Sequence, residues 1–325
     1  MLSVGSWRGG EEAQGVTLPY AVPPGLLEQA ELGADWMDWL DRLPTLFHGV
    51  MADWQLAYDG PPRHGFASLV APVRTPSGQP AALKVTFDGD DESLHEAVAL
   101  QQWNGQGAVR LLRADPHRRA LLLERLHRED LNGMDDVVAC ELVASFYRRL
   151  HVPALPQLRT VTSYVERWVD ALGNLPLNAP IPRRLVGQAT SLGGEFVADP
   201  ASVGVMVHGD LHYENVLAGD REPWLVIDPK AMSGDPHYEP APMLWNRWDD
   251  LVATGNVRDA VRRRFHTLVD AAGLEEDRAR DWVIVRMVLN AHWAIEDAQR
   301  AERSLRADER DWITKCVALA KAVQD

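Results

Sequence analysis

The segment 208–215, His-Gly-Asp-Leu-His-Tyr-Glu-Asn, has the residue types and the spacing that phosphoryl transfer requires. An attacking alcohol needs a carboxylate that orients it and takes its proton, and Asp210 could be this base. A hard divalent cation needs oxygen ligands beside the phosphates, and Asn215 could supply one of them. Asp228, at the end of the apolar run 224–227, could supply another. A lone His-Gly-Asp is a common turn, but the combination predicts a catalytic loop with its metal ligands.

Lys84 lies inside the apolar run 81–85, where an unpaired ammonium group would be destabilised by desolvation. We expect Lys84 to bridge the α- and β-phosphates of a nucleotide and to pair with Glu96 on the next helix. Two alternatives stay open. Lys84 could be an exposed residue of an edge strand, and Glu96 could cap its own helix, because it follows Ser93 at the spacing of a capping box.

Hydrophobic periodicity predicts the elements that position these residues. Short apolar runs alternate with turn residues in 54–87, which is typical of a small antiparallel sheet. A helix should begin at Ser93 and end near Asn104. Two further strands are expected at 109–112 and 120–123. Beyond residue 124 a helical period takes over. It recurs at Val138, Leu142, Phe146 and Leu150 and in the segments 160–172, 256–272, 279–299 and 308–323.

One β-rich island, strands 203–207 and 224–227, interrupts the helices. We expect these two strands to pair and so to bring Asp228 to the loop that follows the first strand. The predicted fold class is therefore α+β, with two lobes. Residues 17–125 form a sheet-rich, nucleotide-binding lobe, and 126–325 form a mostly helical lobe with the catalytic loop and the acceptor site. Residues 1–16 are expected to be a flexible, peripheral N-terminus.

The amino-acid composition limits the kinds of binding partner that we expect for this protein. The 325-residue chain has a formal net charge of −14, which disfavours nucleic acid and suits a cationic ligand, although acidity also simply favours solubility. Its two cysteines, Cys140 and Cys316, lie in apolar stretches and are expected to be buried and reduced. No secretion signal or membrane span is evident. We therefore expect a cytoplasmic monomer without membrane contact.

These motifs resemble the aminoglycoside phosphotransferases, and among them the streptomycin 6-phosphotransferase and hydroxyurea phosphotransferase group. The resemblance covers most of the chain. Its most specific part is Ile-Asp-Pro-Lys at 227–230 followed by Gly-Asp-Pro at 234–236, because this family has Ile-Asp-Pro where protein kinases have Asp-Phe-Gly. The other matching segments are 72–84, 103–112 and the loop 208–215.

The resemblance implies a two-lobed protein-kinase-like fold that holds ATP, or in some relatives GTP, with Mg²⁺ in a cleft. The backbone carbonyl of Glu124 and the amide of Leu126, in the segment 122–126, would then bind the adenine edge, unless this segment is only a buried strand end. The chain departs from Gly-x-Gly-x-x-Gly in the segment 60–68. Backbone amides up to Ser68 are expected to cover the phosphates instead.

The resemblance also implies an acceptor that carries guanidinium groups. Such groups need carboxylates for paired hydrogen bonds and aromatic faces for stacking. The alternative is that acidic residues on the helices of so acidic a protein simply form the solvent-exposed face of each helix. The candidate acceptor residues are Asp235, Glu239, Trp245, Trp293 and Asp297.

Three functions stay open at this stage. The first is a resistance kinase that phosphorylates a hydroxyl of a small cationic molecule, most simply a streptomycin-type aminoglycoside. The second is a metabolic kinase for an amino sugar or another small alcohol. The third, a catalytically inactive nucleotide-binding module, is disfavoured because Lys84, Asp210, Asn215 and Asp228 are all present. Protein-kinase activity is disfavoured because Asp-Phe-Gly and Ala-Pro-Glu are missing.

Overall fold

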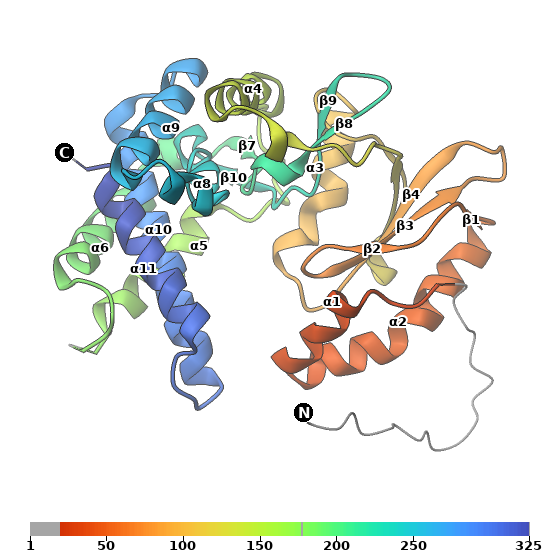
Figure 1. Ribbon diagram of the computed structural model, residues 1–325, viewed down its shortest axis with the longest axis horizontal. Helices are drawn as coiled ribbons and strands as arrows, with labels where there is room; N and C mark the ends of the chain where they lie inside the picture. Colours follow the sequence, from red (N-terminus) through yellow and green to blue (C-terminus); the bar gives the residue numbers. More distant parts are fainter. Residues whose placement is uncertain (1–19, 177, 325) are drawn as a thin grey trace. The chain divides into compact units, whose positions relative to one another are not determined.

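The computed structural model describes residues 20–176 and 178–324, so the predicted N-terminal segment 1–16 lies outside the described residues. The chain divides into two compact units (Figure 1). The first unit runs to Asp91 and also contains Leu111–Arg125. The second unit contains Glu92–Arg110 and the chain from Leu126 onward. The division of the chain into functional lobes at 17–125 and 126–325 stays a prediction.

The first unit contains an antiparallel sheet, as the alternating pattern of 54–87 predicts. Its strands follow the order β1-β3-β4-β6-β5. Strand β2 also pairs with β3, along a different part of it from β1. Lys84 lies in β4, between β3 and β6, and pairs across with Val70 and Leu121. The strands are β1 (Ala57–Tyr58), β2 (Arg63–His64), β3 (Ser68–Arg74), β4 (Pro80–Thr86), β5 (Leu111–Asp115) and β6 (Ala120–Glu124).

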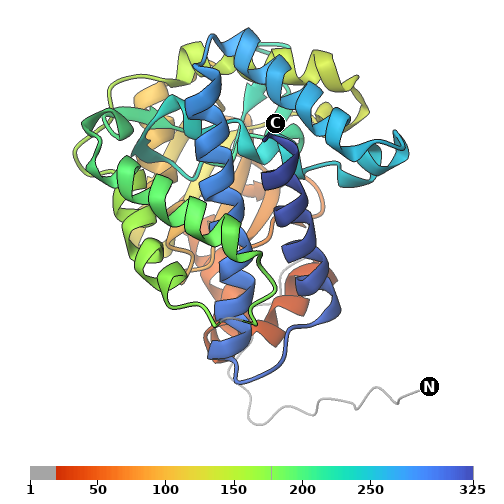
Figure 2. The same cartoon turned by 90° about the vertical axis from the view of Figure 1, so that its left-hand side faces the viewer.

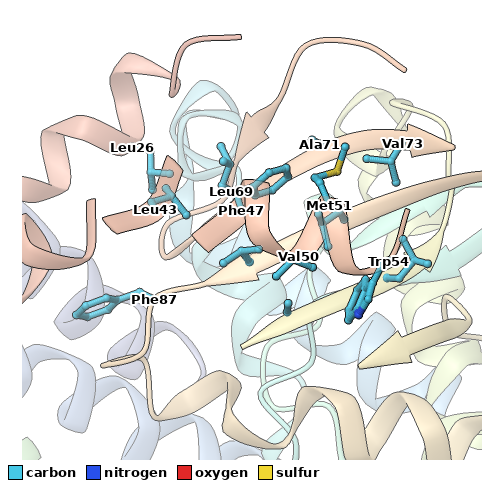
Figure 3. Packing of buried hydrophobic residues seen from close by; sticks show 14 of the residues in the cluster. Leu26, Leu43, Phe47, Val50, Met51, Trp54, Leu69, Ala71, Val73 and Phe87 are labelled. Atoms are coloured by element: carbon cyan, nitrogen blue, oxygen red, sulfur yellow. The ribbon is translucent and has the colours of Figure 1, made fainter. Parts of the chain in front are cut away.

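Helix α2 (Ala34–Asp53), which the sequence analysis missed, covers one face of this sheet. Its buried residues recur at the spacing of one helix face, and they pack on the alternate residues of β3 that point to the same side. Figure 3 shows Leu43, Phe47 and Val50 of α2 against Leu69 and Ala71 of β3. The short helix α1 (Pro24–Leu27) and the turn η1 (Glu28–Leu32) precede α2.

Two predicted boundaries around the insertion 92–110 were wrong. The helix begins at Glu96, not at Ser93, because residues Glu92–His95 form a separate 3-10 turn, η2. Helix α3 (Glu96–Trp103) ends at Asn104 in the left-handed conformation, as expected. The strand predicted at 109–112 begins only at Leu111, since the amide of Val109 donates to the carbonyl of Val226 in the second unit.

The second unit is mostly helical, and all predicted helical segments are confirmed within a few residues. Helix α6 was not predicted. Figure 2 shows α10 and α11 running beside each other, as their mutual packing requires. The main helices are α4 (Asp136–Leu150), α5 (Val161–Gly173), α6 (Arg183–Ala198), α7 (Ala241–Trp245), α8 (Trp248–Ala253), α9 (Val257–Ala272), α10 (Glu276–Arg300) and α11 (Ala307–Ala322).

The prediction of the buried residues of α4 was only partly right. Phe146 and Leu150 are buried, but Val138 is 49% exposed. The buried face instead includes Cys140, which is free, as is the buried Cys316. Burial raises the pKa of each thiol to about 12, so neither is a reactive thiolate. No helix in the described ranges is long and apolar enough to cross a membrane.

The β-rich island consists of two separate antiparallel strand pairs, which corrects the expected pairing. Strand β7 (Val205–Val207) pairs with β10 (Met232–Gly234). Strand β9 (Trp224–Val226) pairs with β8 (Val216–Ala218), which follows the catalytic loop rather than preceding it. The loop 208–215 therefore connects the two pairs.

Candidate active site

His208 fixes the start of the loop from inside the protein. Its side chain is fully buried and lies parallel to the Trp103 ring, with 6.2 Å between the ring centroids. Nδ1 accepts a hydrogen bond from the Asp210 amide at 3.1 Å, so Nε2 is the nitrogen that donates to the Ile227 carbonyl, at 2.9 Å. Desolvation lowers the pKa of His208, which favours this neutral form. The imidazole thus ties Asp210 to the segment before Asp228.

Gly209 is required where the loop turns. Its φ of +82° lies in the left-handed region, and an added Cβ would be 2.6 Å from the Lys230 carbonyl oxygen. The Gly209 carbonyl accepts a hydrogen bond from Arg286, which also donates to the Tyr238 carbonyl at 3.1 Å. The guanidinium of Arg286 lies 4.1 Å from the centroid of the Tyr238 ring. Arg286 therefore joins α10 to the loop.

Glu239 binds the backbone at the start of the loop. Its fully buried carboxylate accepts hydrogen bonds from the backbone amides of His208 (2.5 Å) and Gly209 (3.1 Å). His151 Nε2 lies 3.5 Å from the same carboxylate. Burial alone would raise the pKa of Glu239, but the adjacent His151 and the hydrogen bond from the His208 amide hold it below its usual value. The anionic Glu239 thus positions the catalytic loop.

The β8–β9 pair brings Asn215 and Asp228 to one end of the same hairpin. Asn215 immediately precedes β8, and the amide of Ile227 donates to its carbonyl at 2.9 Å. The Asn215 side-chain amide donates to the Asp210 carbonyl at 2.8 Å, which leaves Oδ1 for a cation. Asp228 follows with a φ of +54°, a conformation that non-glycine residues rarely adopt and that often marks functional sites.

The oxygen atoms of Asn215 and Asp228 suit a Mg²⁺ ion whose other ligands come mainly from the phosphates of a substrate. Within the two described ranges, no three His, Cys, Asp or Glu side chains gather as a complete metal cage would need. Mg²⁺ is typically bound through one or two carboxylates together with phosphate oxygens and water. Asn215 Oδ1 and the Asp228 carboxylate match that requirement. The ammonium of Lys230 lies 3.7 Å from Asp228.

A pocket of about 140 Å³ lies beside Asp210 in the second unit. Burial raises the pKa of Asp210, Arg286 and Lys230 lower it, and the carboxylates of Asp228 and Glu92 raise it; the combined effect brings this pKa to about 7. A carboxylate with a pKa near neutrality suits a general base. The residues lining the pocket are Glu92, Arg159, Tyr164, Gly209, Asp210, Lys230, Met232, Tyr238, Trp245, Arg286, Asn290 and Trp293.

The predicted acceptor residues separate into two groups. Trp245 and Trp293 line the pocket. Asp235 is instead buried among other partners, because Oδ2 accepts hydrogen bonds from Trp282 (2.8 Å) and Arg278 (2.5 Å). Asp297 is exposed and lies 3.4 Å from Arg300. The structure thus does not bring Asp235, Glu239 and Asp297 into the pocket.

The predicted nucleotide residues lie on both units. In the first, Lys84 is only 5% exposed on an inner strand, which excludes the alternative of an exposed edge-strand lysine. Ser68 begins β3 and accepts at its carbonyl from the Gly65 amide at 3.0 Å. Glu124 ends β6. In the second, Glu96 is buried at the start of α3, and Leu126 is the residue at which the chain re-enters this unit.

Sequence reasoning missed several pocket residues, notably Glu92, Arg159 and Arg286. Arg286 carried a usable signal, because an arginine amid the apolar residues 283–289 must find partners when the helix is buried. Glu92 and Arg159 carried none, since each lies in a polar segment that reads as solvated surface.

The antiparallel sheet, the helical unit and the Asp-Asn loop define a kinase-like phosphotransferase. A solved choline/ethanolamine kinase family protein from Mesorhizobium loti has the same fold, with a TM-score of 0.59 and 18% identity, over 86% of this chain and 95% of that one. Residues 53–298 match the family model of the aminoglycoside/hydroxyurea antibiotic resistance kinases.

Two relatives support the same assignment. Streptomycin 6-kinase of Streptomyces glaucescens is 40% identical over 279 residues, which cover 83% of this chain and 88% of the relative. Hydroxyurea phosphotransferase of Kitasatospora aureofaciens is 37% identical over 278 residues, which cover 83% and 78%. The chain therefore belongs to the aminoglycoside/hydroxyurea antibiotic resistance kinase family, as the sequence motifs predict, and is a phosphotransferase that acts on a hydroxyl group.

Proposed function

We propose that this chain transfers the γ-phosphoryl group of ATP, bound with Mg²⁺, to a hydroxyl of a streptomycin-type antibiotic. One observation carries the proposal: the Asp210 carboxylate lines a pocket immediately beside the hairpin end that bears Asn215 and Asp228. The acceptor is proposed from the names of the relatives. The cytoplasmic location, the monomeric state and the choice of ATP over GTP remain predictions.

Asp210 orients the acceptor hydroxyl and takes its proton as the hydroxyl oxygen bonds to the γ-phosphorus. The bond from that phosphorus to the bridging oxygen breaks, so the products are a phosphate ester and ADP. Asn215 and Asp228 would hold Mg²⁺, which neutralises charge on the phosphate oxygens when bound.

The remaining predicted residues have binding roles in this proposal. Lys84 would bind the α- and β-phosphates and pair with Glu96, and backbone amides up to Ser68 would cover the phosphates. The backbone groups of Glu124 and Leu126 would bind the adenine edge.

A panel of acceptors tests the proposal directly. Purified enzyme with Mg²⁺ and either ATP or GTP is given streptomycin, hydroxyurea, amino sugars and small alcohols, and nucleoside diphosphate release is measured. We expect streptomycin to be phosphorylated, with the product identified by mass spectrometry. Turnover of an amino sugar or alcohol without turnover of streptomycin would favour a metabolic kinase. Nucleotide binding without turnover of any acceptor would favour an inactive module.

A further inference from the structure

The three carboxylates predicted for a cationic acceptor have other partners. Asp235 binds Arg278 and Trp282, Glu239 binds the loop amides, and Asp297 lies on the exposed side of α10 near Arg300. An acceptor that carries guanidinium groups would still need a carboxylate in the pocket. Among the lining residues, only Glu92 and Asp210 carry one.

Asp210 is assigned to the reaction as its base. We therefore consider Glu92 as the carboxylate of the pocket that recognises the acceptor. Glu92 begins the turn η2, and its Oε1 lies 3.5 Å from the hydroxyl of Tyr164. It lines the same pocket as Asp210. A cation bound by Glu92 would therefore lie near the reacting hydroxyl.

Aromatic side chains line the pocket together with Glu92. The rings of Tyr164 and Trp293 meet edge to face with 5.4 Å between centroids, and Trp168 backs Trp293 at 5.8 Å. The Arg159 guanidinium lies 5.2 Å from the centroid of the Tyr164 ring and so occupies one face of it, which leaves the edge of Tyr164 and the ring of Trp293 for a group of the acceptor. The indole N–H of Trp293 is buried without a hydrogen-bond partner in the described residues, which is typical of a site that a polar ligand completes.

Two of the cations lining the pocket are already engaged by the protein. Arg286 donates to the carbonyls of Gly209 and Tyr238, and Lys230 lies beside Asp228. Their charge therefore compensates groups of the catalytic loop and the metal-binding end of the hairpin. The pocket volume of about 140 Å³ is close to that of a cavity that accepts benzene, so one ring or one guanidinium-bearing group can enter.

We propose that Glu92 binds a guanidinium group of the acceptor against Tyr164 and Trp293 and so determines acceptor specificity. This inference rests on the proposed function. Loss of one charge-assisted hydrogen-bonded pair weakens binding by about 10- to 100-fold.

Glu92→Gln keeps the shape of the side chain and removes its charge, and Trp293→Leu removes the aromatic face. Asp297→Asn is the matched control, because Asp297 lies on the same helix as Trp293 but outside the pocket. Isothermal calorimetry measures streptomycin binding, and steady-state kinetics measure KM for streptomycin and for ATP. We expect Glu92→Gln to raise the Kd and KM for streptomycin by about 10- to 100-fold, Trp293→Leu to raise them less, and Asp297→Asn to leave them unchanged. The KM for ATP should not change in any variant.

The outcomes separate this inference from the proposed function. If the wild type phosphorylates streptomycin but Glu92→Gln binds it as tightly, the inference fails and the function stands. If the wild type binds streptomycin without phosphorylating it, and Glu92→Gln loses that binding, the function fails and the inference stands. A wild type that does not bind streptomycin overturns both.

Discussion

At the scale of single residues, the group proposed to react is distinct from the groups that hold the loop in place. Asp210 lines the pocket, whereas His208, within the loop, and Glu239, outside it, are buried and bind the loop backbone. This division predicts two kinds of mutant. Changing Asp210 should remove chemistry alone, and changing Glu239 should disturb both chemistry and stability.

Asp210→Ala is expected to lower kcat by at least about a thousandfold, because a general base and the orientation of the hydroxyl are both lost. Nucleotide affinity should survive, since Asp210 is not assigned to the nucleotide. Coupled-assay kinetics and calorimetry with ATP check the two parts. Near-normal turnover would show that Asp210 is not the base.

Glu239→Gln keeps an oxygen acceptor but places an amide nitrogen against the backbone amides of His208 and Gly209. We expect kcat to fall by about 10- to 100-fold and the free energy of unfolding to fall by about 1–3 kcal/mol, the cost of one unsatisfied buried group. The KM for the acceptor should change little. A raised acceptor KM with unchanged kcat would instead support the sequence prediction that Glu239 binds the acceptor.

At the scale of elements, Asp235 joins the turn η7 (Pro236–Tyr238) to α10. Its carboxylate caps the turn by accepting from the His237 amide, and it also binds Arg278 and Trp282 of α10. Burial alone would raise the pKa of Asp235, but hydrogen bonds from His237 and Trp282 lower it to about 2. The ionised carboxylate therefore stabilises the folded protein.

Because the folded pKa is below the ordinary value of 3.8, this stabilisation is present above about pH 4 and is lost as the pH falls toward 2. It amounts to about 2 kcal/mol. Asp235→Asn should lower the free energy of unfolding in urea at neutral pH, and the gap to wild type should narrow below about pH 4. An equal gap at pH 7 and pH 3 would contradict this assignment.

At the scale of the whole molecule, the residues proposed to bind the nucleotide belong to different units. Lys84 belongs to the inner strand β4 of the first unit, whereas Asn215 and Asp228 belong to the β8–β9 hairpin of the second. In the proposed function, the lysine and the metal ligands would act on the nucleotide by different means. Direct charge pairing does not require Mg²⁺, but the contribution of Asp228 does.

Calorimetry with ATP, with and without Mg²⁺, distinguishes these contributions. Asp228→Ala should abolish the gain in affinity that Mg²⁺ provides, because a carboxylate ligand is lost. Lys84→Ala should weaken ATP binding in both conditions. Unchanged Mg²⁺-dependent affinity in Asp228→Ala would contradict its role as a metal ligand.

The sequence alone was sufficient for the parts that depend on near neighbours along the chain. Asp210 and Asn215 lie in one short loop, and the alternation in β3 and β4 and the periodicity of α9 to α11 report which face each element buries. Helix α2 was missed although its buried residues are regularly spaced, because no motif drew attention to 34–53.

Only the tertiary structure decided how the polar side chains are used. The pairing of β7 with β10 joins segments that are far apart in the chain, and the apolar residues of β9 would suit a pairing with either β7 or β8. Asp235 and Glu239 looked available for a cation until buried donors from α10 and the catalytic loop were found to occupy them. A carboxylate has the same local sequence signal whether its partner is a ligand, an arginine or a backbone amide, so its role follows from what the fold places beside it.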